Sequence, residues 1–405
     1  MTVFPSNFLW GASTSPHQIE GNNINSDWWA REGLIPGMEL SGDANDSYHR
    51  YREDMTLLAE AGLNAYRFGI EWARIEPRPG IFSPALIAHY RRMIDTALEL
   101  GIQPIITLHH FSSPAWFAER GGWNAPDATD AFARYVETIA PILEGVSHVV
   151  TINEPNMLAM IINLEAAAAR GDLAQWQSPT VESQSDSEYK QPPLPVPEPE
   201  DGAPLVTAHH VARDVLRDRT DAKVGWSVAC QAFTAAPGGE ARLEQVRWAF
   251  EDYYLDAARS DDYIGVQTYT SQQVDKDGLV PHPASPDNTM IGTAYRPDSL
   301  SVSVAHAAEV TGLPILVTEN GIATPDDERR IAYTREALRG LAANVAGGVQ
   351  VDGYLHWSLL DNYEWGHWSP TFGLIAVDRQ TFVRTPKPSL AWLGRVAGSH
   401  GQSLS

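Results

Sequence analysis

Cysteine is almost absent from the sequence, since Cys230 is the only one among 405 residues. A disulfide within the chain is therefore excluded, and a lone thiol is typical of proteins from a reducing compartment. No run of eighteen apolar residues occurs, and the segment from Met1 to Pro5 has no basic region followed by an apolar stretch. We therefore expect a cytoplasmic protein with neither a membrane span nor a secretory signal.

Basic residues are also scarce. The chain has 29 lysines and arginines against 51 acidic residues, which gives a formal net charge of −22. This excess of negative charge opposes binding to nucleic acid or to anionic lipid. We therefore expect a small-molecule partner, while a homo-oligomer stays open.

Hydrophobic residues make up 43% of the chain, enough for a large core, and they gather in short apolar runs separated by longer amphipathic segments. The predicted strands are Phe8–Ser13, Ala65–Trp72, Pro104–Phe111, His148–Asn153, Lys223–Ala229, Tyr263–Thr270, Pro314–Thr318 and Gly353–Leu359. The predicted helices are Tyr48–Ala61, Pro84–Leu100, Ala128–Leu143, Pro204–Arg217, Ala241–Ala258, Ser301–Thr311, Glu328–Val345 and Pro388–Val396. This alternation predicts an α/β protein with a closed parallel (β/α)8 TIM barrel. An open doubly wound sheet is the alternative, but no glycine-rich phosphate turn follows an early strand.

Two of the predicted strands end in a glutamate. Glu154 follows His148–Asn153, and Glu319 follows Pro314–Thr318. The C-terminal ends of barrel strands meet on one face, so both carboxyls are expected in one site. Cleavage of a glycosidic bond needs such a pair, one group to protonate the leaving oxygen and one to attack or stabilise the sugar. The alternative is that each glutamate ends its strand in solvent.

Other polar and aromatic residues lie at strand ends as well. They are Gln18, Arg67, His109, His110, Asn153, Tyr269, Trp357, Glu364 and Trp365. Amides and carboxylates pair with sugar hydroxyls, and indole rings cover the C–H face of a sugar. Neighbouring residues on a strand point to opposite faces, so at most one of His109 and His110 reaches a common ion. We therefore expect no metal site.

One segment interrupts the alternation. From about Gly171 to Gly202 the chain is rich in Pro, Ser, Glu and Asp, a composition that does not build a core. We interpret it as an extended loop insertion among the loops that follow the Glu154 strand. Whether it serves the site or is an inert surface insertion stays open. The whole chain, residues 1–405, is expected to form a single catalytic domain.

Several blocks together resemble glycoside hydrolase family 1, the β-glucosidase family. The blocks are Phe8 to Ala12, Gln18 to Gly21, Tyr66 to Phe68, Thr151 to Pro155, Thr318 to Gly321 and His356 to Trp365. They occur in the order of the family, from the first strand to the last. The resemblance implies a retaining β-glycosidase, in the first place a β-glucosidase, that removes the terminal non-reducing β-D-glycosyl residue through a covalent glycosyl-enzyme without a cofactor.

The resemblance also implies roles for single residues. Glu154 resembles the acid/base and Glu319 the nucleophile. Arg67 and Tyr269 resemble the partners of the nucleophile, and Asn153 resembles the ligand of the sugar 2-hydroxyl. The residues that resemble the sugar-binding wall are Gln18, His110, Trp357, Glu364 and Trp365, with Phe111 beside His110 and with Phe372 as the aromatic residue that closes the pocket.

Three departures from the family leave the substrate open. Phe111 stands where the family usually has Trp, and Gln267-Thr268-Tyr269 keeps only the last aromatic of the usual Asn-Tyr-Tyr. The segment after Pro155 also lacks the usual pattern, which leaves the aglycone undetermined. Glu364 suits the 4- and 6-hydroxyls of glucose, galactose or fucose and disfavours a 6-phosphate. A transglycosylase would use the same intermediate, whereas an inactive sugar-binding homologue would lack a carboxylate.

Overall fold

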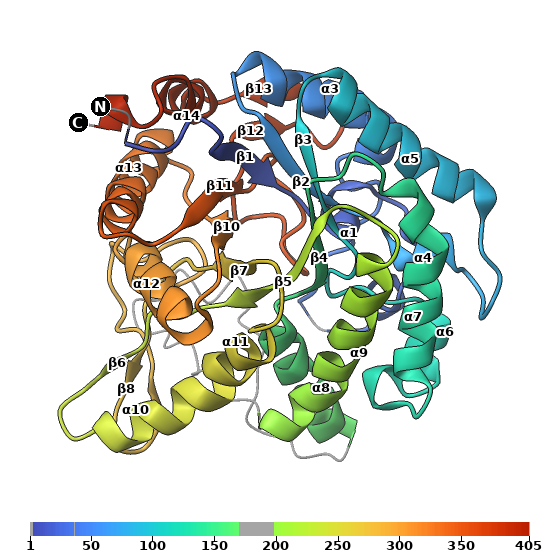
Figure 1. The fold of residues 1–405 in the computed structure, drawn as a ribbon, viewed down its shortest axis with the longest axis horizontal. Coiled ribbons are helices and arrows are strands. Elements are labelled where there is room, and N and C mark those ends of the chain that lie inside the picture. Colours follow the sequence, from blue (N-terminus) through green and yellow to red (C-terminus); the bar gives the residue numbers. More distant parts are fainter. Residues whose placement is uncertain (1–2, 36, 170–197, 405) are drawn as a thin grey trace.

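The computed structural model describes residues 3–35, 37–169 and 198–404. Its centre is a closed barrel of parallel strands in the order β1-β11-β10-β7-β5-β4-β3-β2 (Figure 1). The barrel strands are β1 Leu9–Ser13, β2 Ala65–Gly69, β3 Gln103–Thr107, β4 His148–Asn153, β5 Lys223–Ala229, β7 Ile264–Gln267, β10 Ile315–Asn320 and β11 Val351–Trp357. The predicted (β/α)8 barrel is confirmed, with each of the eight predicted strands in place.

The barrel strands are apolar runs because both of their faces are buried. All residues of β4 and β2 are buried, as expected for strands that have a packed interior on one side and helices on the other. The barrel interior is filled by a cluster of buried side chains. Each comes from a different barrel strand, or in the case of Tyr263 from the residue before β7: Ala65, Ile105, Val150, Tyr263, Leu316 and Leu355. Such a filled interior leaves the open face at the strand ends for chemistry.

Some predicted strands are too long at their C-terminal ends. The strand predicted to reach Trp72 ends at Gly69, because helix α4 (Trp72–Ile75) begins there with the Glu71 side chain accepting from the amide of Ala73 at 3.1 Å. The strand predicted to reach Phe111 ends at Thr107. In both cases the apolar run continues into a buried loop, which the pattern does not distinguish from a strand.

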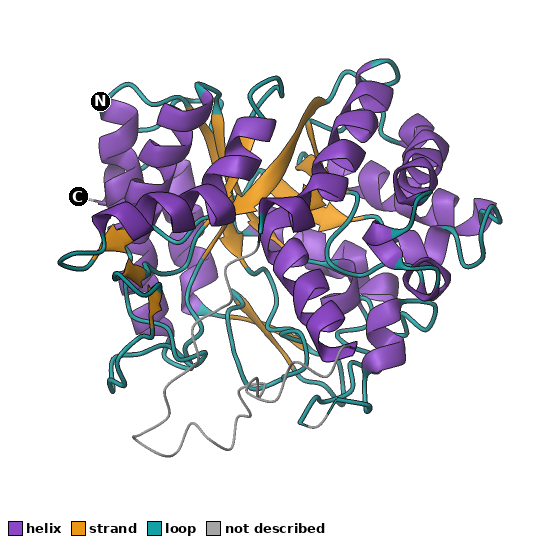
Figure 2. Cartoon of the chain, turned by 90° about the horizontal axis from the view of Figure 1, so that it is seen from below, coloured by secondary structure: helices purple, strands orange, loops and turns teal. Residues whose placement is uncertain are grey.

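The eight predicted helical segments surround the barrel (Figure 1). They are α3 Ser47–Glu60, α5 Pro84–Glu99, α7 Ala128–Ile139, α9 Pro199–Arg217, α10 Glu240–Arg247 with η4 Trp248–Asp252 and α11 Tyr253–Ala257, α12 Ser299–Thr311, α13 Asp327–Ala346 and α14 Pro388–Gly398. Viewed from the side, helices lie on both sides of the strands (Figure 2).

Helix α9 begins earlier than the sequence pattern indicates. The predicted loop insertion extends to Gly202, but residues from Pro199 onward are helical. Pro199 is the first helical residue, and Glu200 and Asp201 lie in the first turn, a combination that favours a helix start. The end of the predicted insertion is therefore wrong, and its part from 171 to 197 lies outside the described residues.

Helix α8 (Pro155–Ala169), directly after β4, was not predicted. The smaller elements are α1 Pro16–Ile19, α2 Asp27–Arg31, α6 Ala115–Glu119, η1 Gly122–Asn124, η2 Ala140–Ile142, η5 Gln402–Leu404, the sheet β6 Thr234–Ala235 with β8 Gln273–Val274 and β9 Leu279–Val280, and the pair β12 Ile375–Val377 and β13 Arg384–Pro386.

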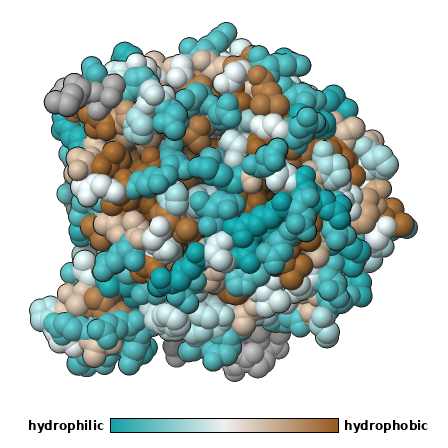
Figure 3. Space-filling model, in the orientation of Figure 1, coloured by the Kyte–Doolittle hydropathy of each residue, from teal (hydrophilic) through white to brown (hydrophobic). Residues whose placement is uncertain are grey.

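The outer surface mixes hydrophilic and apolar residues on the face shown in Figure 3. Among the helices of residues 3–35, 37–169 and 198–404, none combines the length and the apolar character that a membrane crossing requires.

Candidate active site

A cavity of about 340 Å³, here called the central cavity, lies at the C-terminal ends of the barrel strands. Glu154 and Glu319 both line it, so the structure brings the two strand-end carboxyls into one site, as predicted. Other predicted site residues that line it are His110, Phe111, Asn153, Tyr269, Trp357, Glu364, Trp365 and Phe372. Arg67 and Gln18 lie behind this wall and reach the site through hydrogen bonds.

The carboxyl of Glu319 accepts three hydrogen bonds. Arg67 Nη1 donates to Oε1 at 2.6 Å and Gln267 Nε2 donates to the same oxygen at 2.8 Å. The Tyr269 hydroxyl donates to Oε2 at 2.5 Å. Burial raises the pKa of Glu319, whereas the Arg67 charge and these hydrogen bonds act in the opposite direction. Donors on both oxygens stabilise the ionised carboxylate.

Arg67 is fully buried and joins several barrel strands. Its Nε donates to Thr107 Oγ1 at 2.8 Å, and its Nη2 donates to Asn153 Oδ1. Asn153 Oδ1 also accepts from Gln267 Nε2 at 2.8 Å. Gln267 was not among the predicted site residues, although its two-residue spacing from Tyr269 is the strand period that places both on one face.

The hydrogen-bond network assigns the proton on His110. Because Asn153 Oδ1 accepts from Arg67 and Gln267, Asn153 Nδ2 is the atom that donates to His110 Nε2, at 3.1 Å. Burial and the Arg67 charge hold the pKa of His110 well below its usual value, so the ring is neutral and its hydrogen lies on Nδ1. No described residue accepts from that N–H, which leaves it for a ligand hydroxyl.

His109 does not line the central cavity, so only one of the two neighbouring histidines reaches it, as predicted, although both lie beyond the end of β3 at Thr107. Its Nε2 lies 2.9 Å from Ser113 Oγ, and its ring packs edge-on against Trp123 at 5.0 Å. Burial lowers the pKa of His109 to about 3. The two neighbouring histidines therefore have different roles, one in the core and one in the cavity wall.

Glu154 has different surroundings from Glu319. Among the described residues, none donates a hydrogen bond to its carboxyl. Burial, followed by the negative charge of Glu319, raises the pKa of Glu154 well above its usual value, with Arg67 acting weakly in the other direction. At φ 44° its backbone is in the left-handed region, a strained conformation for glutamate at the junction between β4 and α8. The arrangement favours a protonated Glu154 beside an ionised Glu319.

Two hydrogen-bond donors hold the carboxyl of Glu364 in the wall of the central cavity. Trp357 Nε1 donates to its Oε1 at 3.2 Å and Gln18 Nε2 donates to its Oε2 at 3.1 Å. Burial raises the pKa of Glu364 to about 8. The sequence pattern suggests a charged clamp; burial disfavours that charge, whereas the hydrogen bonds from Trp357 and Gln18 favour it.

Aromatic rings complete the wall. Trp365 lies 6.0 Å from the ring of His110 in a stacked arrangement and 5.1 Å from Phe111 in an edge arrangement. Phe372 packs edge-on against Tyr269 at 5.7 Å.

Lining residues that were not predicted are Trp28, Met157, Ile161, Ile291, His367 and Pro370. Met157 and Ile161 follow Glu154 at helical spacing, which is the only local signal for any of these residues.

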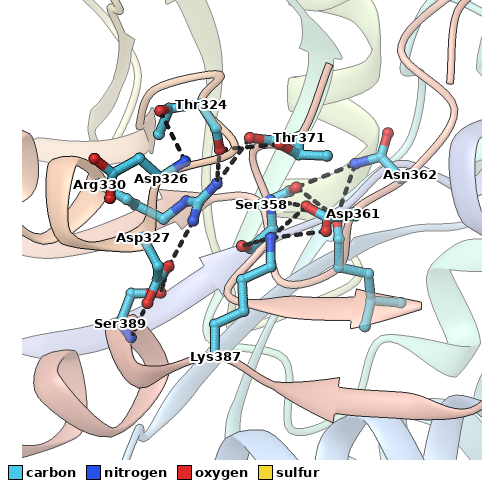
Figure 4. A network of polar contacts seen from close by, with 12 residues as sticks. Thr324, Asp326, Asp327, Arg330, Ser358, Asp361, Asn362, Thr371, Lys387 and Ser389 are labelled. Carbon is cyan, nitrogen blue, oxygen red and sulfur yellow. Dashed lines mark hydrogen bonds and ion pairs between the residues drawn. The ribbon is translucent and has the colours of Figure 1, made fainter. Parts of the chain in front are cut away.

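A buried arginine holds the loop that carries the far wall of the cavity (Figure 4). Arg330 on α13 donates from Nη2 to the carbonyl oxygens of Thr324, at 2.6 Å, and Thr371, at 2.8 Å. Thr371 precedes Phe372 in the chain. Arg330 therefore ties the loop after β10 to the loop after β11, beside the ring that lines the site.

Lys387 and Asp361 fix the same loop from the other side (Figure 4). Lys387 Nζ lies 2.7 Å from Asp361 Oδ2 and donates to the carbonyl of Gly373 at 2.9 Å. The neighbouring Asn362 accepts from Gln18 Nε2 at 2.9 Å, which connects this network with Glu364.

One group of carboxylates and imidazole in the described part of the chain is close enough to share a cation. It consists of Glu251, Asp252 and His306, of which His306 Nε2 lies 2.6 Å from Asp252 Oδ1. None of the three lines the central cavity, so this group is separate from the two glutamates.

Comparison with known proteins agrees with this geometry. The sequence model described as glycosyl hydrolase family 1 matches residues 1–184 and 233–402. The chain is 28% identical over 462 residues to the 1,4-beta-D-glucan glucohydrolase of Thermotoga neapolitana, covering 99% of both chains. It is 28% identical over 443 residues to beta-glucosidase A of Acetivibrio thermocellus, covering 98% of this chain and 99% of that protein. The crystal structure of the beta-glycosidase BGL167 superposes with a TM-score of 0.87 at 41% identity, covering 98% and 97% of the two chains.

Proposed function

The chain belongs to glycosyl hydrolase family 1, and from this premise we propose that it is a retaining β-glycosidase, in the first place a β-glucosidase, with Glu154 as acid/base and Glu319 as nucleophile. The observation that carries the proposal is the contrast between the two carboxyls. Glu319 receives three hydrogen bonds, whereas Glu154 has a strongly raised pKa next to it. One cavity thus holds a carboxyl whose ionised form is stabilised by donors and a carboxyl that favours its protonated form.

In the first step, a Glu319 oxygen attacks the anomeric carbon while Glu154 gives its proton to the leaving oxygen. The glycosidic bond breaks, and an ester joins the sugar to Glu319. The ester carries no charge, so the negative charge of Glu319 no longer raises the pKa of Glu154. Glu154 can then act as a base. It then takes a proton from water, which attacks the anomeric carbon and releases Glu319.

Three neighbours support the nucleophile in this scheme. Arg67 and Gln267 hold one carboxylate oxygen and Tyr269 holds the other. Burial, followed by the charge of Glu319, keeps the pKa of Tyr269 well above its usual value, so the phenol stays a donor. These contacts orient the attacking oxygen and oppose its protonation.

The glycone is bound by groups that have unused hydrogen-bonding capacity. Asn153 has a second amide hydrogen for the 2-hydroxyl, and His110 Nδ1–H is available to the adjacent hydroxyl. The Oε1 atom of Gln18 has no partner among the described residues, and with Glu364 it suits the 4- and 6-hydroxyls. Trp357, Trp365, Phe111 and Phe372 enclose the apolar faces of the sugar ring.

The cavity favours neutral sugars. The described residues that line it include no lysine or arginine, so a 6-phosphate would lose its hydration with no permanent cation as a partner and with only the imidazoles of His110 and His367 nearby. We therefore propose activity on neutral β-glycosides, with glucose, galactose and fucose as the glycones to compare.

Two alternatives share much of this site. A transglycosylase would pass the same glycosyl-enzyme to a sugar or alcohol instead of water. An inactive sugar-binding homologue would need no acid and no nucleophile, and the presence of both glutamates in one cavity argues against it.

The proposal extends to the organisation and surroundings of the protein. The family match over residues 1–184 and 233–402 supports one catalytic domain. The net charge of −22 disfavours nucleic acid as a partner, and the single cysteine favours a cytoplasmic location. A homo-oligomer stays open, and light scattering of the purified protein measures it.

A panel of nitrophenyl glycosides of both anomers and several sugars tests the reaction class and the glycone together. We expect turnover of β-glycosides only. NMR of the first product from a β-glycoside should show the β-anomer, because two displacements restore the configuration. Initial release of the α-anomer would exclude the covalent route through Glu319. Addition of excess alcohol measures the share of transfer.

A further inference from the structure

Trp365, which lines the central cavity, has a strained backbone. At φ 46° it lies in the left-handed region, which a bulky residue rarely adopts. Such a conformation persists only where the surrounding contacts hold it in place. The contacts of the Trp365 side chain therefore indicate which residues fix this part of the cavity wall.

Four rings of the described residues pack around the ring of Trp365. The rings of Trp28, His110 and Phe111 lie 4.6, 6.0 and 5.1 Å from it, and these three residues line the central cavity themselves. The fourth ring is that of His17, whose centroid lies 5.8 Å away with the two planes only 7° from parallel. His17 does not line the central cavity. It therefore contacts Trp365 from behind the wall, where a bound sugar does not reach.

The ring of His17 is itself fixed at both nitrogens. The side chain is fully buried, its Nε2 lies 2.9 Å from Glu32 Oε1, and its Nδ1 lies 3.2 Å from Asn23 Nδ2. Glu32 Oε2 in turn accepts from the amide and the hydroxyl of Ser41, at 2.8 and 2.9 Å. These bonds to opposite sides of the imidazole determine the plane of its ring.

Glu32 is an ionised partner for this histidine. Burial alone would raise the pKa of Glu32, but the hydrogen bonds from His17 and Ser41 lower it below its usual value. A carboxylate is only an acceptor, so His17 Nε2 is the donor in a charge-assisted hydrogen bond. Burial of such a pair requires the desolvation of both groups, and apolar side chains of similar volume would often give equal or higher stability. A gain in stability is therefore a poor explanation for the pair.

The residue that follows His17 has a parallel role. Gln18 donates to the carboxyl of Glu364, and its carbonyl oxygen accepts from the amide of Tyr363 at 3.3 Å. Helix α1 thus presents two consecutive side chains to two consecutive residues of the cavity wall, Gln18 to Glu364 and His17 to Trp365. The sequence identified Gln18 but not His17, because stacking on a residue so distant in the chain leaves no local pattern.

We propose that His17 is a positioning residue for sugar binding: its imidazole, held by Glu32, keeps the indole of Trp365 in the plane that contacts the glycone. The inference rests on the proposed β-glycosidase function and adds a residue to it. Neither Glu154 nor Glu319 is among the described residues that His17 hydrogen-bonds or packs its ring against. His17 therefore acts on the binding of the sugar and not on the breaking of the bond.

Free monosaccharides test sugar binding apart from bond cleavage, because as competitive inhibitors they occupy the glycone site without a leaving group. Glucose, galactose and fucose are compared, and the sugar that inhibits most strongly is used. His17→Gln removes the ring and keeps an amide that can donate to Glu32. We expect its inhibition constant to rise by about threefold to tenfold, as for the loss of an aromatic contact, while kcat for the nitrophenyl β-glycoside of the same sugar stays unchanged.

Two further variants serve as comparison and control. His17→Phe keeps a flat ring and loses the bond to Glu32, so its inhibition constant should lie between those of the unaltered enzyme and His17→Gln. His89→Gln is the matched control, since His89 is also buried and stacked, on Tyr48 at 3.9 Å and 16°, but does not line or support the central cavity. In this control the inhibition constant should stay unchanged.

A crystal structure of His17→Gln gives a readout that does not depend on activity. In the unaltered enzyme the ring planes of Trp365 and His110 differ by 23°. We expect the Trp365 ring to leave this orientation once the imidazole behind it is removed. A Trp365 ring that keeps its orientation overturns the inference.

The double variant of His17→Leu with Glu32→Leu decides the matter where His17→Gln does not fold. It removes the buried charge together with the ring, an exchange that often preserves stability. The same rise of the inhibition constant is expected in this variant.

The outcomes separate this inference from the proposed function. If the unaltered enzyme cleaves no β-glycoside, the proposed function fails. If it cleaves β-glycosides but the variants without the ring bind the sugar as tightly as the unaltered enzyme, His17 is not a positioning residue and the function stands. A fall of kcat as large as the loss of sugar affinity would likewise overturn the inference, because it would place the effect of His17 on the catalytic step.

Discussion

At the scale of single residues, Glu154 and Glu319 carry the same functional group in different surroundings. Three donors face Glu319, whereas the carboxyl of Glu154 receives none from the described residues. A buried carboxyl without donors favours its neutral form, and one with donors tolerates its charge. The environment therefore supports the proposed roles of Glu154 as acid and Glu319 as nucleophile.

The first prediction separates these roles by substitution. Glu319→Ala should abolish turnover of all substrates, since no group remains to attack the anomeric carbon. Glu154→Ala should spare the first step for substrates with good leaving groups, because these depart without a proton. Added azide should accelerate this variant and yield the β-glycosyl azide. Equal loss on activated and unactivated substrates would show that Glu154 is not the acid.

The second prediction concerns the coupling between the two carboxyls. Because the charge of Glu319 contributes to the raised pKa of Glu154, Glu319→Gln should lower that pKa. NMR titration of ¹³C-labelled glutamate side chains measures it, with Glu154→Gln identifying the signal. An unchanged pKa would mean that burial alone holds the proton.

The third prediction concerns Glu364. Glu364→Ala removes the acceptor of Trp357 Nε1 and Gln18 Nε2 and the partner of two sugar hydroxyls. We expect kcat/KM to fall by roughly tenfold to a hundredfold for each hydrogen bond lost, at about 1.5 to 3 kcal/mol per bond. Since burial raises the pKa of Glu364 to about 8, the neutral isostere Glu364→Gln should lose less at pH 7 than Glu364→Ala.

The same residue can be tested with an altered substrate. The unaltered enzyme should cleave a β-glucoside far better than its 6-phosphate, because the described lining residues of the central cavity offer no cationic side chain of lysine or arginine. A preference for the phosphorylated sugar would contradict the assignment of Glu364 to the 4- and 6-hydroxyls.

At the scale of elements, the long loop between β11 and β12 carries Glu364, Trp365 and Phe372 and is held from outside the barrel. Arg330 on α13 binds the Thr371 carbonyl, and Lys387 before α14 binds Asp361. Buried cations with several carbonyl and carboxylate acceptors fix loop geometry, and the outer helices thereby position the sugar wall.

The fourth prediction tests this bracing. Arg330→Met removes one of the two donors to each of the Thr324 and Thr371 carbonyls and the ion pair with Asp327, so the unfolding free energy should fall by about 1.5–3 kcal/mol, the contribution of a hydrogen bond to a charged group. KM should rise more than kcat falls, because sugar binding depends on the loop and the two catalytic glutamates do not. Urea unfolding and steady-state kinetics measure both effects.

Arg329 provides the control on the same helix. Its guanidinium lies over the ring of Tyr295 at 5.1 Å, and its Nη2 donates to the exposed carbonyl of Asp287, contacts worth about 0.5–1.5 kcal/mol each at exposed sites. Arg329→Met should therefore leave KM unchanged and lower stability little. A similar rise of KM in both variants would mean that α13 as a whole, and not the Arg330 contact, determines the loop.

At the scale of the whole molecule, some of the many acidic residues are buried carboxyls that favour the neutral form. Burial is the main cause that raises the pKa of both Glu71 and Glu251 to about 7. Such groups bind protons more tightly in the folded than in the unfolded state. The contribution of these two groups to the unfolding free energy therefore falls as pH rises from about 4.5 to about 7.

The fifth prediction measures one of these contributions. A pKa of about 7 against the ordinary 4.5 corresponds to about 3 kcal/mol of stability that is present at low pH and lost near neutrality. Glu251→Gln keeps an acceptor for the amide of Gln231 but cannot ionise. Urea unfolding at pH 5 and pH 7.5 should show a smaller difference in this variant by about 2.4 kcal/mol, since part of the loss has already occurred at pH 5. An equal pH dependence in both proteins would refute a raised pKa.

The sequence by itself determined the barrel and the two strand-end glutamates, because strands buried on both faces must be apolar runs and the residue that ends each run lies on the open face. It missed α8, whose apolar residues follow the β4 strand without an amphipathic pattern that would mark a new element. It also placed the start of α9 too late, since the capping residues there lie within a Pro-rich segment.

Only the tertiary structure decided which polar groups meet. Arg67 and Glu319 are separated by 252 positions, and the place of Gln267 between Glu319 and Asn153 depends on the register of three strands. The raised pKa of Glu364 likewise follows from burial among segments that are distant in the sequence. Local periodicity reports which face of an element is buried, whereas pairing, protonation and cavity shape depend on what packs against that face.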